Sequence, residues 1–162
     1  MTFTVYTDGG CSGNKIGAGC PGGYGYIILD PADTIIIKGG GHRINVTNNQ
    51  MELLAAIRGL ERLKKELDES HGGASKHDCI VRPDSQYVSE NYASYLQGWK
   101  ASGWRKSNGK KVLNSNLWKQ LDNITPEFKS FSFKWVKGHS SNKYNNIVDT
   151  IATEQILIAK SK

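Results

Sequence analysis

The 162-residue sequence lacks any apolar run that approaches the roughly 18 residues needed to cross a bilayer. Cysteine is also scarce, and the three cysteines (Cys11, Cys20 and Cys79) contain no Cys-x-x-Cys pair. Such a set argues against a disulfide framework or a zinc ribbon and is typical of a reducing compartment. The N-terminus lacks the basic and then apolar pattern of a secretory signal. These absences predict a cytoplasmic protein that does not span a membrane.

Acidic residues are outnumbered by basic ones. Lys and Arg total 21 against 15 Asp and Glu, which gives a formal net charge of +6. This balance favours a polyanionic partner, nucleic acid first and an anionic membrane surface second, although a charge that only keeps the protein soluble explains the total equally well. The distribution is more informative, because residues 98–111 hold five basic residues, two tryptophans and no acid.

The chain has the length of one domain, 1–162, that can bury a large core without disulfides or a structural metal. Alternating or β-branched segments predict strands over 2–8, 24–30, 34–40, 79–84 and 128–136. Helical spacing of apolar residues predicts helices from Asn48 to about His71 and over 86–97, 115–122 and 142–159, with a C-terminal tail at about 157–162. This order predicts an α/β fold with one mixed sheet, in which the first three strands are antiparallel.

Four acids lie at the ends or edges of these predicted elements. Asp8 ends the first strand, Asp84 ends the fourth, Glu52 lies near the start of the long helix and Asp149 lies beside the buried face of the last one. If the first and fourth strands are neighbours, Asp8 and Asp84 meet at one edge of the sheet. Clustered carboxylates repel one another unless cations lie between them. Oxygen ligands favour Mg²⁺ or Mn²⁺, and two such ions about 4 Å apart can cleave phosphodiesters.

Each acid also has a purely structural interpretation. Asp8 and Gly9 are a common turn pair, Glu52 suits the first turn of a helix, and Asp84 suits a helix N-cap. Asp149 is harder to explain in this way, because an acid beside a buried helical face needs a partner. Spacing alone leaves both interpretations open.

Six short motifs occur in a characteristic order along the chain. They are TDGG (7–10), TNNQMEL (47–53), DSQYV (84–88), the GW…GW stretch (98–104), NSNLWKQL (114–121) and WVKGH (135–139). With these motifs the sequence resembles a type 1 ribonuclease H along nearly its whole length. The resemblance implies the ribonuclease H-like fold, a five-stranded mixed sheet flanked by helices. It also implies an endonuclease that hydrolyses the RNA strand of RNA–DNA hybrids and leaves 5′-phosphate and 3′-hydroxyl ends.

The resemblance also assigns a catalytic set. Asp8, Glu52, Asp84 and Asp149 match the metal-binding carboxylates of the family, and Asp149 follows His139 by the family's spacing of ten residues. His139 matches a loop histidine that assists proton transfer or product release. The implied cofactors are two Mg²⁺ ions, for which Mn²⁺ can substitute.

Further positions match the substrate-binding residues of the family. Asn14, Asn48, Asn49 and Gln86 match contacts to RNA 2′-hydroxyls, for which amides are suitable partners. Thr47 matches a contact to a DNA-strand phosphate, and Cys11 lies near the substrate groove. Residues 98–111 match the basic handle of the family, whose candidate contacts are Trp99, Lys100, Trp104, Arg105, Lys106, Lys110 and Lys111. The implied partner is an RNA–DNA hybrid duplex, bound by a monomer through its backbones with little sequence specificity.

Several aromatic residues have two interpretations. Trp99 and Trp104 either anchor the handle or contact the DNA strand. Core packing is favoured over base stacking for four other aromatics, which are Trp118, Phe131, Phe133 and Trp135.

Two other functions remain open. An exonuclease or integrase-like protein of the same superfamily would arrange its acids differently and lack this motif series. A non-catalytic binder of hybrid or double-stranded RNA has no reason to hold four acids near phosphates.

Overall fold

The structure is a computed structural model that describes residues 1–13, 20–136 and 142–161. Its strands are β1 (Thr2–Cys11), β2 (Cys20–Leu29), β3 (Ile35–Val46), β4 (Asp78–Pro83) and β5 (Ser130–Phe133). Its helices are α1 (Asn48–Ser70), α2 (Gln86–Ser94), α3 (Leu96–Ala101), α4 (Ser115–Ile124) and α5 (Lys143–Lys160), with short 3-10 turns η1 (Ala74–Lys76) and η2 (Thr125–Glu127). Within these ranges, no helix combines the length and apolar character needed to span a bilayer.

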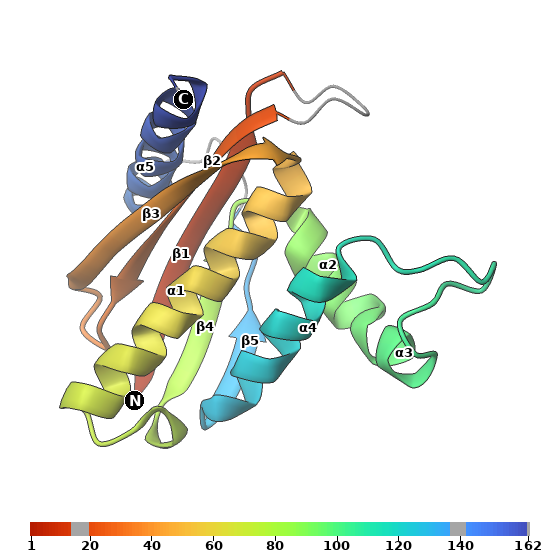
Figure 1. Cartoon of the computed structure of the whole chain (residues 1–162). Coiled ribbons are helices and arrows are strands. Elements are labelled where there is room, and N and C mark those ends of the chain that lie inside the picture. Colours follow the sequence, from red (N-terminus) through yellow and green to blue (C-terminus); the bar gives the residue numbers. More distant parts are fainter. Residues whose placement is uncertain (14–19, 137–141, 162) are drawn as a thin grey trace.

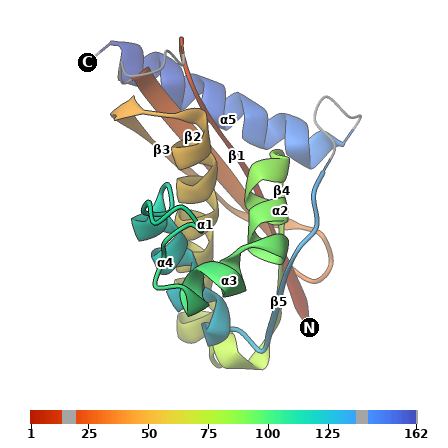
Figure 2. The same cartoon turned by 90° about the vertical axis from the view of Figure 1, so that its right-hand side faces the viewer.

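The five strands form one mixed sheet in the order β3-β2-β1-β4-β5. β1, β2 and β3 are antiparallel, whereas β4 runs parallel to β1 and β5 runs parallel to β4. Helices α1, α2 and α4 cover one face of the sheet, and α5 crosses the opposite face (Figure 1, Figure 2). The predicted α/β fold, with its mixed sheet and antiparallel first three strands, is therefore confirmed.

The long helix α1 begins at the predicted residue because its capping box forms. Thr47 Oγ1 accepts the Gln50 N–H at 3.2 Å, and Gln50 Oε1 accepts the Thr47 N–H at 3.0 Å. Behind this cap, a row of leucines that includes Leu60 and Leu67 is fully buried against the sheet. Each such side chain stabilises the fold by about 1.5–3 kcal/mol. This packing fixes the helix across β1, which in turn determines where the first turns of α1 lie.

On the opposite face, α5 lies directly on glycines of β2. A Cβ atom at Gly23 would come within 2.5 Å of the Ile156 nitrogen, and one at Gly25 within 2.7 Å of the Ile151 side chain. Gly23 lies outside the predicted strand 24–30 but continues β2, and both glycines allow the helix to approach closely.

Several predicted boundaries were wrong. β1 continues three residues past Asp8, because its glycines remain paired with β2. The helix predicted over 86–97 is divided into α2 and α3 at Tyr95, where φ is −124°. The last helix continues to Lys160 and so includes most of the segment 157–162 that was predicted as a tail.

Candidate active site

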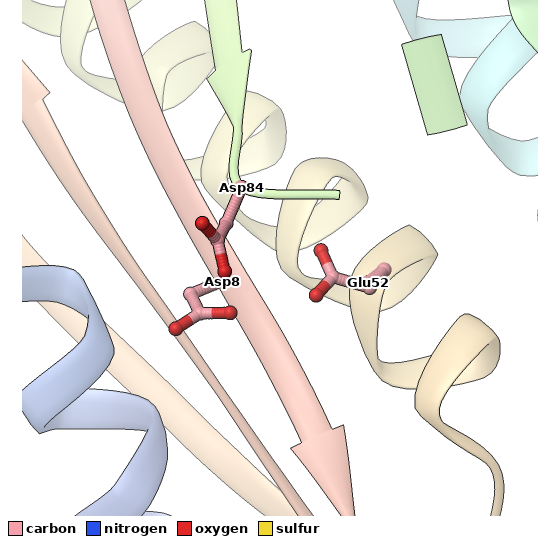
Figure 3. A group of neighbouring side chains, drawn as sticks. All are labelled: Asp8, Glu52 and Asp84. Carbon is pink, nitrogen blue, oxygen red and sulfur yellow. The ribbon is translucent and has the colours of Figure 1, made fainter. Parts of the chain in front are cut away.

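Three carboxylates from distant parts of the chain converge beside β1. Asp8 lies within β1, Asp84 directly follows β4, and Glu52 lies near the start of α1 (Figure 3). One oxygen atom from each of these three side chains lies within 4.8 Å of the other two. The sequence-based expectation that Asp8 and Asp84 meet at neighbouring strands is confirmed.

The parallel pairing of β1 with β4 brings the two aspartates together. The last pair of this ladder joins Thr7 to Pro83, and the Asp84 N–H donates to the Thr7 carbonyl oxygen at 3.2 Å. Asp8 follows Thr7 and Asp84 follows Pro83, so the two aspartates lie side by side just after the last pair of the ladder.

Gly9 allows α1 to bring Glu52 to the same place. A Cβ atom at Gly9 would lie 2.4 Å from the Met51 carbonyl group, so any side chain at this position would push α1 away from β1. The Gly9 N–H also donates to Glu52 Oε1 at 3.3 Å, which holds this carboxyl toward Asp8. The close approach of Glu52 to the aspartates thus depends on a glycine beside Asp8.

The structural interpretations of these acids were wrong. Asp8 and Gly9 lie in a paired strand and not in a turn. Ser85 caps α2 instead of Asp84, since Ser85 Oγ accepts the Tyr87 N–H at 3.0 Å. Glu52 lies beyond the first turn of α1, which holds no acid, and is only 6% exposed.

Asp149 reaches the cluster from the opposite face of the sheet. It lies on the exposed side of α5, and a protonated Asp8 carboxyl donates a side-chain hydrogen bond to it. Asp149 is therefore exposed and adjoins the three clustered carboxyls through Asp8.

Burial and repulsion from neighbouring carboxylates make Asp8 and Glu52 difficult to ionise. Burial, and then the negative charges of Asp84 and Asp149, raise the pKa of Asp8 from 3.8 to about 8. Burial and the charges of Asp8 and Asp84 likewise raise the pKa of Glu52 well above its ordinary value. Glu52 Oε2 and Asp84 Oδ1 are also buried without a hydrogen-bond partner among the described residues.

A divalent cation bound between these carboxyls would offset their mutual repulsion and would give the two unpartnered oxygens a partner. Its charge would stabilise the ionised carboxylates, and the unpartnered oxygens would become ligands. An all-oxygen set without His or Cys suits Mg²⁺ or Mn²⁺. The residues present therefore fit the metal that the sequence resemblance implies.

The amide residues predicted to bind RNA lie on either side of the carboxylates. Asn48 and Asn49 open α1, one turn before Glu52, and Gln86 opens α2, two residues after Asp84. Asn48 Oδ1 also accepts the Cys11 N–H at 2.8 Å, which joins the end of β1 to the start of α1. Thr47 is the N-cap of α1, and its hydroxyl oxygen accepts the Gln50 N–H. Two further predicted residues, Asn14 and His139, lie outside the described residues.

The handle (98–111) extends from α3 and projects beyond the body of the domain (Figure 1). Its basic residues are not equivalent. Lys100 forms an ion pair with Asp122 of α4 at 3.2 Å, so an acid from another element neutralises it. The Arg105 guanidinium donates to the Gly109 carbonyl oxygen at 3.1 Å, whereas Lys106 and Lys110 are exposed.

The handle tryptophans anchor it to the domain. Trp99 and Trp104 are partly buried against the main core, and the Trp99 ring lies 5.6 Å from the buried Trp118 ring. Lys119 of α4 also lies over the Trp104 ring, 5.6 Å from its centroid. The anchoring interpretation is confirmed, and contact with a DNA strand stays a prediction.

A groove of about 700 Å³ separates the end of the handle from α1. Its lining includes Lys111 and Asn114, together with Arg58 of α1 and Arg43 of β3. Sequence reasoning missed Arg43 and Arg58, because no local pattern connects them to the handle. Arg43 extends the basic surface beyond residues 98–111, whereas Arg58 forms an ion pair with Glu61 at 2.7 Å.

The sequence predicted that Trp135 packs in the core, and this prediction was wrong. Trp118 is fully buried, and Phe131 and Phe133 pack against the core, but Trp135 is 39% exposed. Its indole N–H donates to the Asp84 carbonyl oxygen at 3.0 Å. Trp135 is therefore a neighbour of the carboxylate group.

The family model for RNase H matches residues 1–157 of the chain. The chain belongs to the RNase H family. The ribonuclease H of Treponema denticola is 37% identical over 160 residues, covering 95% of this chain and 96% of that protein. The ribonuclease H of Nitrobacter hamburgensis is 38% identical over 159 residues, covering 98% of this chain and 94% of that protein. These full-length matches identify this RNase H family member as an enzyme.

Solved RNase H structures share the fold. LC11-RNase H1, whose structure is in complex with an RNA/DNA hybrid, matches with a TM-score of 0.71 and 23% identity, covering 98% of this chain and 99% of that one. A second match is the N-terminal RNase H domain of a Mycobacterium tuberculosis protein, solved as a fusion with maltose-binding protein. Its TM-score is 0.72 at 22% identity, and the match covers 99% of this chain and 96% of that one.

Proposed function

We propose that this RNase H family member is an endonuclease that hydrolyses the RNA strand of RNA–DNA hybrids with two Mg²⁺ ions. The observation that carries the proposal is the convergence of Asp8, Glu52 and Asp84, which Asp149 joins through Asp8. The LC11-RNase H1 structure in complex with an RNA/DNA hybrid supports the choice of substrate.

Each carboxylate has a proposed role in this reaction. Asp8, Glu52, Asp84 and Asp149 would hold the metal ions against the scissile phosphate. When bound, two ions activate a water molecule and stabilise the leaving 3′-oxygen, which gives a 5′-phosphate and a 3′-hydroxyl. The proposed role of His139 is to assist proton transfer or product release. Mn²⁺ has the same preference for oxygen ligands and would support the reaction as well.

Selection of the RNA strand is proposed to depend on the amides beside the carboxylates. Asn48, Asn49 and Gln86, together with Asn14, would contact 2′-hydroxyls, the groups that distinguish RNA from DNA. Thr47 and the basic groove beside the handle would hold the DNA strand through its phosphates. Because phosphate contacts carry no base information, little sequence specificity is expected.

One assay tests this function against its competitors. Labelled RNA–DNA hybrid, double-stranded RNA and double-stranded DNA are each incubated with Mg²⁺ or with EDTA. We expect internal cleavage of the RNA strand of the hybrid alone, lost in EDTA. Digestion only from the ends would indicate an exonuclease, and binding without cleavage would indicate a non-catalytic binder. Either result would contradict the proposal.

The handle is expected to bind phosphates through its exposed lysines. Replacement of Lys106, Lys110 and Lys111 by Ala should weaken hybrid binding in EDTA and reduce the slope of log K against log salt by about 2–3, because each lost phosphate contact removes roughly 0.9. Lys100→Ala should have a smaller effect, since Asp122 already neutralises Lys100. Lys76→Ala, in η1, is the control for charge. An unchanged slope in the triple variant would refute the handle as a phosphate contact.

A further inference from the structure

Asp84 lies in a break between two regular elements. β4 ends at Pro83, and α2 begins at Gln86 with Ser85 as its N-cap. The Asp84 carbonyl therefore precedes the helix and accepts none of its hydrogen bonds. This carbonyl group therefore needs a donor from outside the helix, and its hydrogen bond lies at an exposed position.

The segment after β5 supplies that donor. Past the end of β5, the Lys134 and Val136 N–H groups still donate to the Val81 and Pro83 carbonyl oxygens at 2.9 and 3.0 Å. The Trp135 indole N–H lies between these two bonds in sequence and donates to the Asp84 carbonyl oxygen at 3.0 Å. Main chain and side chain together extend the parallel ladder to the residue that carries the carboxylate.

The side chain of Asp84 needs this support. Its Oδ1 atom is buried and accepts no hydrogen bond within the described ranges. Repulsion from Asp8 and Glu52 also acts to push this carboxylate away from the cluster. Its direction is thus set by the main chain, which is held by Thr7 at the Asp84 N–H and by Trp135 at the carbonyl.

The position of Trp135 is consistent with this role and unusual for a core residue. Strand alternation puts it on the same side as Phe131 and Phe133, which pack edge-to-face on Tyr92 of α2. Yet Trp135 remains 39% exposed, so burial of its ring is incomplete while its single polar group is engaged.

We propose that Trp135 is a positioning residue for Asp84, which orients this carboxylate for the divalent ion by holding its main-chain carbonyl through the indole N–H. The inference rests on the proposed metal-binding function. Loss of the donor would let the 84–85 peptide rotate, and the carboxylate would then spend less time directed at Asp8 and Glu52. The cost would fall on metal binding and not on global stability.

Trp135→Phe tests this inference, because it keeps an aromatic ring and removes the N–H. With Mn²⁺ alone as the probe, calorimetric titration without nucleic acid should show a dissociation constant about three- to tenfold higher than that of the wild type, as for one lost hydrogen bond. The melting temperature in EDTA should fall by less than about 4 °C. Activity should return toward the wild-type kcat as Mg²⁺ is raised. Trp104→Phe makes the same chemical change in the handle and should leave Mn²⁺ affinity unchanged.

Two outcomes would overturn the inference. Unchanged Mn²⁺ affinity in Trp135→Phe would exclude a positioning role, and weaker hybrid binding with normal Mn²⁺ affinity would make Trp135 a substrate contact instead. A wild type that binds no Mn²⁺, or Asp8→Asn binding as tightly as the wild type, would overturn the proposed function itself.

The wild type provides a second test that does not depend on whether the variant folds. We expect its Trp135 indole N–H to exchange slowly with solvent, and its NMR signal to shift during a Mg²⁺ titration with the same midpoint as the Ser85 amide. Exchange at the rate of a free indole, or no shift, would contradict the inference.

Discussion

Asp8→Asn is expected to lower the rate of hybrid cleavage by about three orders of magnitude or more, while hybrid binding in EDTA is retained. Asp8 is close to every other member of the cluster, because its oxygen lies within 4.8 Å of those of Glu52 and Asp84 and its carboxyl hydrogen bonds to Asp149. The substitution preserves the side-chain volume but removes one negative charge and replaces a ligand oxygen with an amide. Metal ions contribute several kcal/mol to stabilisation of a phosphoryl transition state, and each 1.4 kcal/mol is a tenfold change in rate.

Single-turnover cleavage of a labelled hybrid, together with a binding titration in EDTA, measures both parts of this prediction. Asp33→Asn makes the same chemical change in the turn between β2 and β3, and should leave cleavage unchanged. An Asp8→Asn enzyme that retains more than about a tenth of the wild-type rate would contradict the assignment of Asp8 to the metal site.

In EDTA, the free energy of unfolding of the wild type is expected to fall as the pH rises from about 5 to 8. The native pKa of Asp8 is about 8 and that of Glu52 is well above its ordinary value, whereas both groups ionise near pH 4 in the unfolded chain. The native protein therefore binds more protons than the unfolded chain in this range, so stability decreases with pH. The slope is at most about 1.4 kcal/mol per pH unit for each retained proton.

The same cluster predicts that Asp8→Asn is more stable than the wild type in EDTA at pH 8, because one of the repelling charges is gone. Saturating Mg²⁺ should reverse the order, since the ion binds the native wild type and stabilises it by mass action. Urea denaturation of both proteins at pH 5 and pH 8, with EDTA or with Mg²⁺, measures the free energy of unfolding under each of these four conditions. A stability of the wild type in EDTA that does not change between pH 5 and pH 8 would show that the carboxyls are already ionised in the native protein.

Local patterns in the sequence were sufficient for the elements that position the site. The spacing of leucines and the Thr47–Gln50 capping box predicted where α1 begins, and therefore where Glu52 lies. The ends of the first and fourth predicted strands brought Asp8 and Asp84 together once the strands were assumed to be neighbours. Helical spacing singled out Asp149, but only the family motifs grouped it with the other acids, because its contact with Asp8 crosses the sheet.

Features that depend on contacts between distant segments were not predicted. Nothing in the sequence indicated that Gly9 lies against the main chain of α1, since this depends on how closely the helix crosses β1. The ion pair of Lys100 with Asp122 reduces the charge of a segment that contains no acid of its own. Trp135 was assigned to the core from its residue type, and only the register of the segment after β5 shows its bond to Asp84.

The docking of α5 on the glycines of β2 has a consequence for the synthesis of the protein. Asp8, Glu52 and Asp84 all belong to the first 84 residues, but Asp149 joins them only when the last helix packs across β1 and β2. A chain still being translated therefore lacks one of the four acids until α5 has left the ribosome and packed on the sheet.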